Sequence, residues 1–156
     1  MNTQPSSAFR RRLLGLLSLS ALGVATAAAA SAPARVQPAP RLKVVYHLND
    51  PEQAPHALRY ITNHLKVHPD SDVHVVTHGS GINFLIKDAK DSFDEFYAPQ
   101  VEELSKKGVR FLVCNNTLVG RKISADSLIS TASIVESGAL EVARLQCDEG
   151  FAYFKP

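Results

Sequence analysis

Short apolar runs alternate with amphipathic segments along the chain after residue 40. Five runs rich in β-branched side chains predict strands over residues 42–48, 73–77, 109–114, 133–135 and 151–155. Apolar positions at helical spacing predict helices over 52–68, 92–107 and 137–147, with shorter pieces over 82–86, 115–120 and 124–128. Ser92 and Glu95 match a capping box for the middle helix, whereas Pro99 indicates a kink or a later start. Gly108 and Gly150 are expected to end the second and third helices.

Strands that alternate with helices predict an α/β domain with a mainly parallel five-stranded sheet and helices on both faces. Right-handed crossovers favour a flavodoxin-like strand order, 2-1-3-4-5. In that order strands one and three are neighbours, and ligands bind beyond their carboxyl ends. The expected crevice is bordered by His47, Asn49 and Asp50 after strand one, and by Cys114, Asn115 and Asn116 after strand three.

The first 30 residues have a different pattern. Arg10, Arg11 and Arg12 precede an apolar run over 13–24 and an alanine-rich stretch over 25–30. This is the pattern of a signal peptide, with cleavage expected near Ala30. The consecutive arginines resemble a twin-arginine signal, and general secretion is the open alternative. The apolar run is too short to span a bilayer, so we expect a periplasmic or secreted mature protein without a membrane span.

The mature domain is expected to occupy residues 42–156. Residues 31–41 contain three prolines and no periodic pattern, which predicts an extended linker. The formal net charge of +2 comes from 17 Lys+Arg against 15 Asp+Glu. Without the three arginines of the leader the balance is 14 against 15, a net charge of −1. Because a nucleic-acid-binding domain needs clustered cations, the sequence predicts no nucleic-acid partner.

Cys114 is the strongest candidate for chemistry. It ends the third strand and precedes the turn Asn115-Asn116, where backbone N–H groups and the positive end of a helix would stabilise a thiolate. The alternative is a small side chain that only packs, because free cysteine is among the most buried residue types. His47 could polarise or deprotonate Cys114 across the predicted switch point, as in Cys–His nucleophilic sites. Its alternative is a core histidine that bonds a backbone carbonyl.

Other candidate residues give weaker signals. His78 ends the second strand, and Gly79, Ser80 and Gly81 after it could hold a small anion with backbone N–H groups. Cys147 should lie at the opposite end of the sheet from Cys114, so we expect two free thiols rather than a disulfide. The sequence has no nucleotide-binding, hydrolase or zinc motif, and we expect neither a metal nor a cofactor.

Four segments together resemble the DsrE/DsrF-like family: KVVYHLND at 43–50, HGSGINFL at 78–85, GVRFLVCNNTL at 108–118 and GALEVARLQCDEGFAYFKP at 138–156. Their order and spacing carry the resemblance, which covers the whole predicted domain. In sulfur-relay members the matching cysteine carries sulfur as a persulfide between partner proteins, and relatives often form trimers or hexamers. The resemblance therefore implies a persulfide on Cys114, a sulfur donor or acceptor protein as partner, and a homo-oligomer. Sulfur relay is usually cytoplasmic, so the export signal departs from that role.

Two functions remain open at this point. The first is a thiol-based sulfur carrier that uses Cys114. The second is a non-catalytic periplasmic module that binds a small anion or a partner loop, in which Cys114 is structural. Phe93, Phe96 and Tyr97 are either interface aromatics of the expected oligomer or ordinary core residues.

Overall fold

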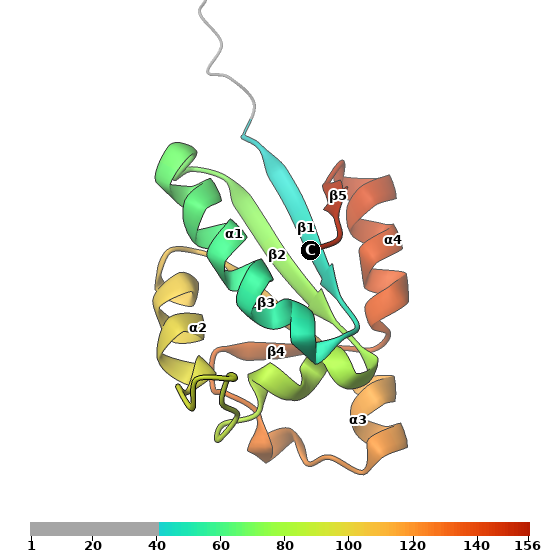
Figure 1. The fold of residues 1–156 in the computed structure, drawn as a ribbon. Coiled ribbons are helices and arrows are strands. Elements are labelled where there is room, and N and C mark those ends of the chain that lie inside the picture. The colour runs from blue at the N-terminus through green and yellow to red at the C-terminus, as the bar shows by residue number, and fades with distance from the viewer. Residues whose placement is uncertain (1–40) are drawn as a thin grey trace, which may run out of the picture. The chain divides into compact units, whose positions relative to one another are not determined.

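A computed structural model describes residues 41–156 as one sheet with helices on both faces (Figure 1). The predicted signal peptide and all but the last residue of the predicted linker lie outside the described residues. The strands are β1 (Lys43–Leu48), β2 (Asp72–Thr77), β3 (Arg110–Cys114), β4 (Ala132–Val135) and β5 (Ala152–Phe154). The α-helices are α1 (Ala54–Val67), α2 (Tyr97–Lys106), α3 (Asn115–Arg121) and α4 (Gly138–Glu149), and 3₁₀ helices cover Pro51–Gln53, Gly79–Leu85 and Ala125–Ser127.

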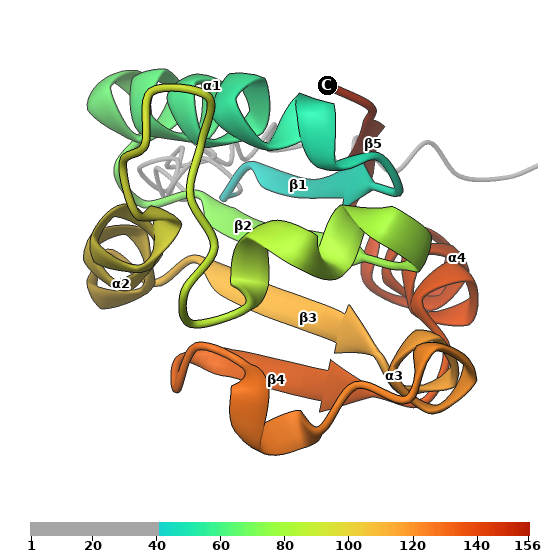
Figure 2. The same cartoon turned by 60° about the horizontal axis from the view of Figure 1, so that its bottom comes forward.

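All neighbouring strands pair in parallel, in the order β4-β3-β2-β1-β5. Figure 2 shows β1 to β4 side by side, with α3 next to the arrowheads of β3 and β4. The predicted α/β class and five-stranded parallel sheet are confirmed, but the predicted order 2-1-3-4-5 is wrong, since β2 lies between β1 and β3. The chain steps in one direction from β1 to β4, and α4 then returns it to the free edge of β1. Right-handed crossovers permit either order, so the alternation of elements could not choose between them.

The two faces of the sheet have separate cores, because side chains alternate between faces along a strand. In β1, Val44 belongs to the larger core, which α1 and α2 cover. Its neighbour Val45 belongs to the smaller core, where it packs with Val142 and Leu145 of α4. The face that α4 covers also carries the side chains of the candidate site.

The middle helix begins later than its capping box predicts. α2 starts at Tyr97, so Pro99 lies in its first turn, where a missing N–H is tolerated. The loop before it is held by Asp91, whose Oδ1 accepts the N–H groups of Phe93 at 2.8 Å and Glu95 at 3.1 Å. The predicted cap at Ser92 is therefore wrong. Gly108 follows the helix at a φ of 94°, as expected for a glycine that ends a helix.

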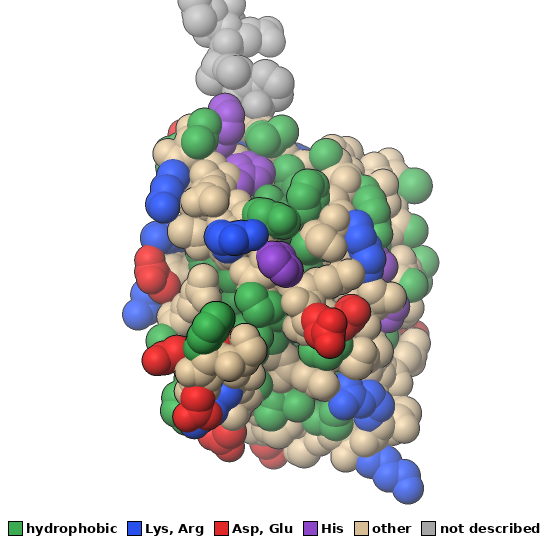
Figure 3. Space-filling view, viewed as in Figure 1, with side chains coloured by type: hydrophobic (Ala, Val, Ile, Leu, Met, Phe, Trp, Pro, Cys, Tyr) green, Lys and Arg blue, Asp and Glu red, His purple; other side chains and the backbone are tan. Residues whose placement is uncertain are grey.

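The surface of the described domain mixes polar and apolar side chains. On the face seen in Figure 3, charged side chains of both signs are interspersed with hydrophobic ones. Phe93 is 84 % exposed, and Val67, Val119 and Leu140 are also largely exposed. Within residues 41–156, no helix has the length and apolar character needed to cross a membrane.

Candidate functional site

Cys114 ends β3 and is the residue from which α3 begins. Side chains alternate between the two faces along β3, and Leu112 packs in the core under α4 whereas Val113 packs on the opposite face. Cys114 lies two residues after Leu112, so its side chain also faces α4. The residue is buried, with 4 % of its surface exposed. The thiol therefore lies under the first turn of α4 rather than in open solvent.

Burial and hydrogen bonds to the sulfur shift the pKa of Cys114 in opposite directions. Burial raises the pKa of the thiol, because it disfavours the thiolate. The backbone N–H of Gly138, at the start of α4, acts in the opposite direction by donating to the sulfur. The hydroxyl and N–H of Thr117 and the N–H of Asn116, in the first turn of α3, also donate to it. Together these donors outweigh burial, and the pKa of Cys114 lies below its ordinary value.

The glycine at position 138 favours the close approach of α4 to the sheet. A Cβ atom at this position would lie 3.2 Å from the Cβ of Cys114 and 3.2 Å from the Cβ of His78. It would also lie 3.1 Å from the carbonyl oxygen of Thr77. A Cβ at these distances would require the neighbouring atoms to shift by a few tenths of an ångström. The missing Cβ therefore helps the Gly138 N–H to reach the sulfur.

The histidine beside Cys114 lies just after β2 and not in β1. The sequence places His47 opposite Cys114 across a switch point, but β2 separates β1 from β3. His78 directly follows β2, and its Cβ approaches the same point above Gly138 as the Cβ of Cys114. The expectation that strands one and three are adjacent, with His47 next to Cys114, is therefore wrong.

His47 instead forms a hydrogen-bonded chain with two other side chains. Its Nε2 lies 2.7 Å from Nε2 of His78, and its Nδ1 lies 2.8 Å from the hydroxyl oxygen of Tyr153. Burial, His78 and Lys155 lower the pKa of His47 to about 4, and burial and Lys155 also lower the pKa of His78. Both imidazoles are neutral near pH 7. Each can then donate from one nitrogen and accept at the other.

Lys155 brings a positive charge to the same edge of the sheet. Its ammonium group donates a hydrogen bond to the side-chain oxygen of Asn49, which directly follows β1. It lies close enough to lower the pKa of both His47 and His78. The reversal of chain direction falls between β1 and β5, so Asn49, Lys155 and Tyr153 border the true switch point of this sheet.

The 79–81 segment is packed against its neighbours. The N–H of Gly79 donates to Oγ1 of Thr117 at 2.9 Å, and the N–H of Gly81 donates to the carbonyl of His78 at 3.1 Å. The Ser80 hydroxyl donates to the carbonyl of Asn49 at 3.1 Å. A Cβ at Gly81 would lie 2.5 Å from the Leu48 carbonyl oxygen, so this glycine is required for close packing. Two of the N–H groups expected to hold an anion are thus already engaged.

The remaining predicted residues differ in their exposure and in their contacts. Asp50 accepts the N–H of Glu52 at 3.0 Å and caps the 3₁₀ helix Pro51–Gln53, which is a structural contact. Asn115 and Asn116 are exposed in the first turn of α3, next to the buried Cys114. Cys114 and Cys147 are both free thiols, as predicted, with Cys147 exposed late in α4.

The comparisons with known proteins bear on the whole described domain. The DsrE/DsrF-like family matches residues 19–156. The chain belongs to this family. No functionally curated protein matches it.

Two solved structures resemble this DsrE/DsrF-like domain. One is a protein of unknown function from Methanobacterium thermoautotrophicum, MTH1491, with 30% sequence identity and a TM-score of 0.65. The other is the ychN protein from E. coli, with 18% identity and a TM-score of 0.62, which supports the fold alone. Each comparison covers 74% of this chain and 99% of the other.

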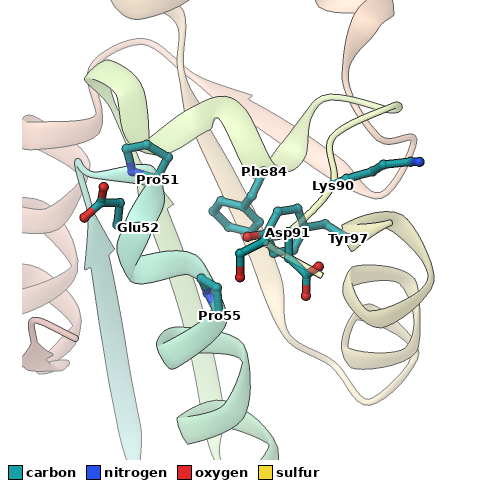
Figure 4. Close-up of a pocket in the computed structure, with 8 residues that line it drawn as sticks. Pro51, Glu52, Pro55, Phe84, Lys90, Asp91 and Tyr97 are labelled. Carbon is teal, nitrogen blue, oxygen red and sulfur yellow. The ribbon is translucent and has the colours of Figure 1, made fainter. Parts of the chain in front are cut away.

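The DsrE/DsrF-like domain also has a pocket on the face that α1 and α2 cover. The pocket has a volume of about 410 Å³ and lies between the start of α1, the 90–92 loop and α2. Figure 4 shows Phe84 and Tyr97 between the two helices, and their rings pack edge to face at 5.7 Å. Pro51 and Pro55 border the pocket from the α1 side. Within residues 41–156 no group of three His, Cys, Asp or Glu side chains is placed to hold a metal ion.

Several residues of the site have no signal in the sequence of this DsrE/DsrF-like chain. Tyr153 and Lys155 reach the site because β5 pairs with β1, which the predicted order does not allow. In the sequence, Gly138 has only the pattern of a residue at the start of a helix. Its close approach to Cys114 follows from the packing of α4 on the sheet. Thr117 belongs to the turn after Cys114, and its two hydrogen bonds could have been suspected from that position.

Proposed function

We propose that the protein is a thiol-based sulfur carrier in which Cys114 holds sulfur as a persulfide. The observation that carries the proposal is the set of donors around the sulfur: the N–H of Gly138, the N–H of Asn116, and the hydroxyl and N–H of Thr117. A thiolate is the nucleophile in sulfur exchange, and these donors favour it over the neutral thiol. Membership of the DsrE/DsrF-like family supports the same role.

The donors suit a persulfide as well as a thiolate. Attack by the Cys114 thiolate on a sulfane sulfur forms a new S–S bond and breaks the bond in the donor, whose electron pair leaves with the donor thiolate. The same backbone N–H groups remain beside the sulfur and can stabilise the negative charge of the product. Because Cys114 is buried, transfer requires a donor that reaches it past the exposed Asn115 and Asn116.

Mass spectrometry of the purified domain tests this function. Incubation with polysulfide should add about 32 Da per persulfide, and a reductant should remove it. The Cys114→Ser variant should show no such gain, whereas Cys147→Ser should behave as the native protein does. A protein whose Cys114 is alkylated readily but never gains sulfur would not be a sulfur carrier.

The low exposure of Cys114 favours a second candidate, a non-catalytic module that binds a partner loop or a small anion. In that case Cys114 packs under α4, and the charge at the site comes from Lys155. The Cys114→Ser variant separates the two functions. It should abolish sulfur loading by a carrier, and it should leave binding by a module intact.

The carrier is also proposed to be exported and oligomeric. The leader pattern of the sequence supports a periplasmic or secreted protein, with a donor or acceptor protein in the same compartment. Phe93 is 84 % exposed on the loop before α2, and Phe96 is 50 % exposed beside it, which supports a homo-oligomer such as a trimer or hexamer. Cell fractionation and light scattering test these two statements separately.

A further inference from the structure

Four side chains at the carboxyl end of the sheet form a row across four adjacent strands. Tyr153 belongs to β5, His47 to β1, His78 directly follows β2, and Cys114 ends β3. Each of them lies two residues after a member of the core under α4, and these members are Phe151, Val45, Val76 and Leu112 in the same order. The side chains therefore point to one face of the sheet.

Hydrogen bonds connect three of these four groups. The Tyr153 hydroxyl oxygen lies 2.8 Å from Nδ1 of His47, and Nε2 of His47 lies 2.7 Å from Nε2 of His78. The chain has an open end at Tyr153, which is 45 % exposed. Its other end is His78, which follows β2 as the neighbour of Cys114 across the sheet. The Cβ atoms of both residues would lie 3.2 Å from a Cβ on Gly138.

The chain can exist in two arrangements of protons. In one, the Tyr153 hydroxyl donates to His47, His47 donates to His78, and Nδ1 of His78 carries a proton. In the other, His78 donates to His47 and His47 donates to Tyr153. A shift between them moves one proton along the row without charging either ring. Lys155 favours proton transfer through neutral rings, because its positive charge disfavours a protonated imidazole at His47 or His78.

We propose that Tyr153, His47 and His78 form a proton relay between solvent and the buried thiol of Cys114, which supplies or removes the proton that accompanies each sulfur transfer. The proposal rests on the sulfur-carrier function. During loading, the Cys114 thiolate attacks the outer sulfur of a donor R–S–SH. The donor S–S bond breaks and its electron pair leaves on R–S⁻, which takes one proton from Nδ1 of His78.

The balanced step is Cys114–S⁻ + R–S–SH + H⁺ → Cys114–S–SH + R–SH. The proton taken from His78 is replaced through His47 and Tyr153 from solvent. Unloading to an acceptor thiol runs the same steps backwards and releases one proton through Tyr153. No redox partner is needed, because the sulfane sulfur keeps its oxidation state.

The experiment compares two rates in the same variants, with glutathione persulfide as donor and iodoacetamide as alkylating agent. Tyr153→Phe removes the outer group, and His47→Gln breaks the chain in the middle. We expect sulfur transfer at pH 7 to fall about 10-fold in the first and about 100-fold in the second. Alkylation should stay within about twofold in both, because the donors to the Cys114 sulfur remain. Imidazole added to the buffer should restore part of the lost rate in His47→Gln.

Tyr60→Phe is the matched control, since Tyr60 is a similarly exposed tyrosine on α1, and both of its rates should be unchanged. Transfer rates that stay native in both relay variants would overturn the relay while leaving the carrier function in place. Parallel losses of transfer and alkylation would also overturn it, because the row would then act only by shaping the surroundings of Cys114. A native protein that takes up no sulfur would overturn the carrier function and the relay together.

Discussion

Gly138 and Cys114 are so close that a Cβ on the glycine would lie 3.2 Å from the Cβ of the cysteine. The contact joins two segments that are far apart in the sequence, the end of β3 and the first turn of α4. It places the N–H of Gly138 on the sulfur. The reactivity of the thiol therefore depends on how α4 packs against the sheet.

Gly138→Ala tests this dependence. The new methyl group has to push α4 away from the sheet, which should cost about 1–3 kcal/mol of unfolding free energy. The same shift weakens the Gly138 hydrogen bond, so the pKa of Cys114 should rise and alkylation at pH 7 should slow. The control is Gly120→Ala in α3, where a Cβ meets no atom within 4 Å. Equal alkylation rates in the two variants would show that Gly138 does not tune the thiol.

Thr117 supplies a second test, because its hydroxyl serves two partners. Oγ1 accepts the N–H of Gly79 at 2.9 Å and donates to the Cys114 sulfur. Thr117→Val leaves both partners without it, which should cost about 1–3 kcal/mol of unfolding free energy. The pH at which alkylation reaches half its maximum should rise. Thr117→Ser keeps the hydroxyl and should retain the native profile, and a native profile in Thr117→Val would contradict the role of the hydroxyl.

The sequence predicted the strands and helices well for a physical reason. Hydrophobic periodicity is a local property, and it predicted each strand that leads to the site. The order of the strands is set by which helix covers which face, and no local pattern records this. The wrong order exchanged the roles of two histidines, because it placed His47 beside Cys114 where His78 lies. It also hid Tyr153, which reaches His47 only because β5 pairs with β1.

The stability of the protein should depend on pH through its buried histidines. Burial lowers the pKa of His74 despite the nearby carboxylate of Asp72, and the pKa of His47 is lowered to about 4. In the unfolded chain both side chains have ordinary pKa values near 6.5. At a pH between the folded and the unfolded pKa of a histidine, the unfolded state binds more protons than the folded state. The stabilisation present above about pH 6.5 is therefore lost as the pH falls towards 4.

Chemical denaturation at a series of pH values measures this dependence. The free energy of unfolding should be level from pH 7 to 8 and should decrease below about pH 6.5. His74 is 3 % exposed and packs on the ring of Phe151 at 4.6 Å, so its protonation should contribute to the decrease. A His74→Gln variant should have a shallower slope than the native protein. A native slope in this variant would assign the acid sensitivity to other groups.

Lys155 should help to keep the histidine pair neutral. Its ammonium group lowers the pKa of both His47 and His78, although burial is the larger cause for each. In Lys155→Met the pKa of His47 should therefore rise from about 4 but stay below 6.5. NMR titration of the ring protons measures both histidines directly. Lys87→Met is the control, because Lys87 donates to the carbonyl of Asp126 on the other side of the sheet from α4. Identical titrations in the two variants would exclude an effect of Lys155 on the pair.

Phe93 should contribute to self-association if the protein is a homo-oligomer. It is 84 % exposed and stands on the loop that borders the pocket between α1 and α2. A buried aromatic contact of this kind is often worth more than 1 kcal/mol, so Phe93→Ser should weaken association by about 10-fold or more. Sedimentation over a range of concentrations measures the change. Val67→Ser is the control, because Val67 is 73 % exposed at the far end of α1 and away from this loop. If both variants associate like the native protein, the contact surface lies elsewhere and Phe93 needs another explanation.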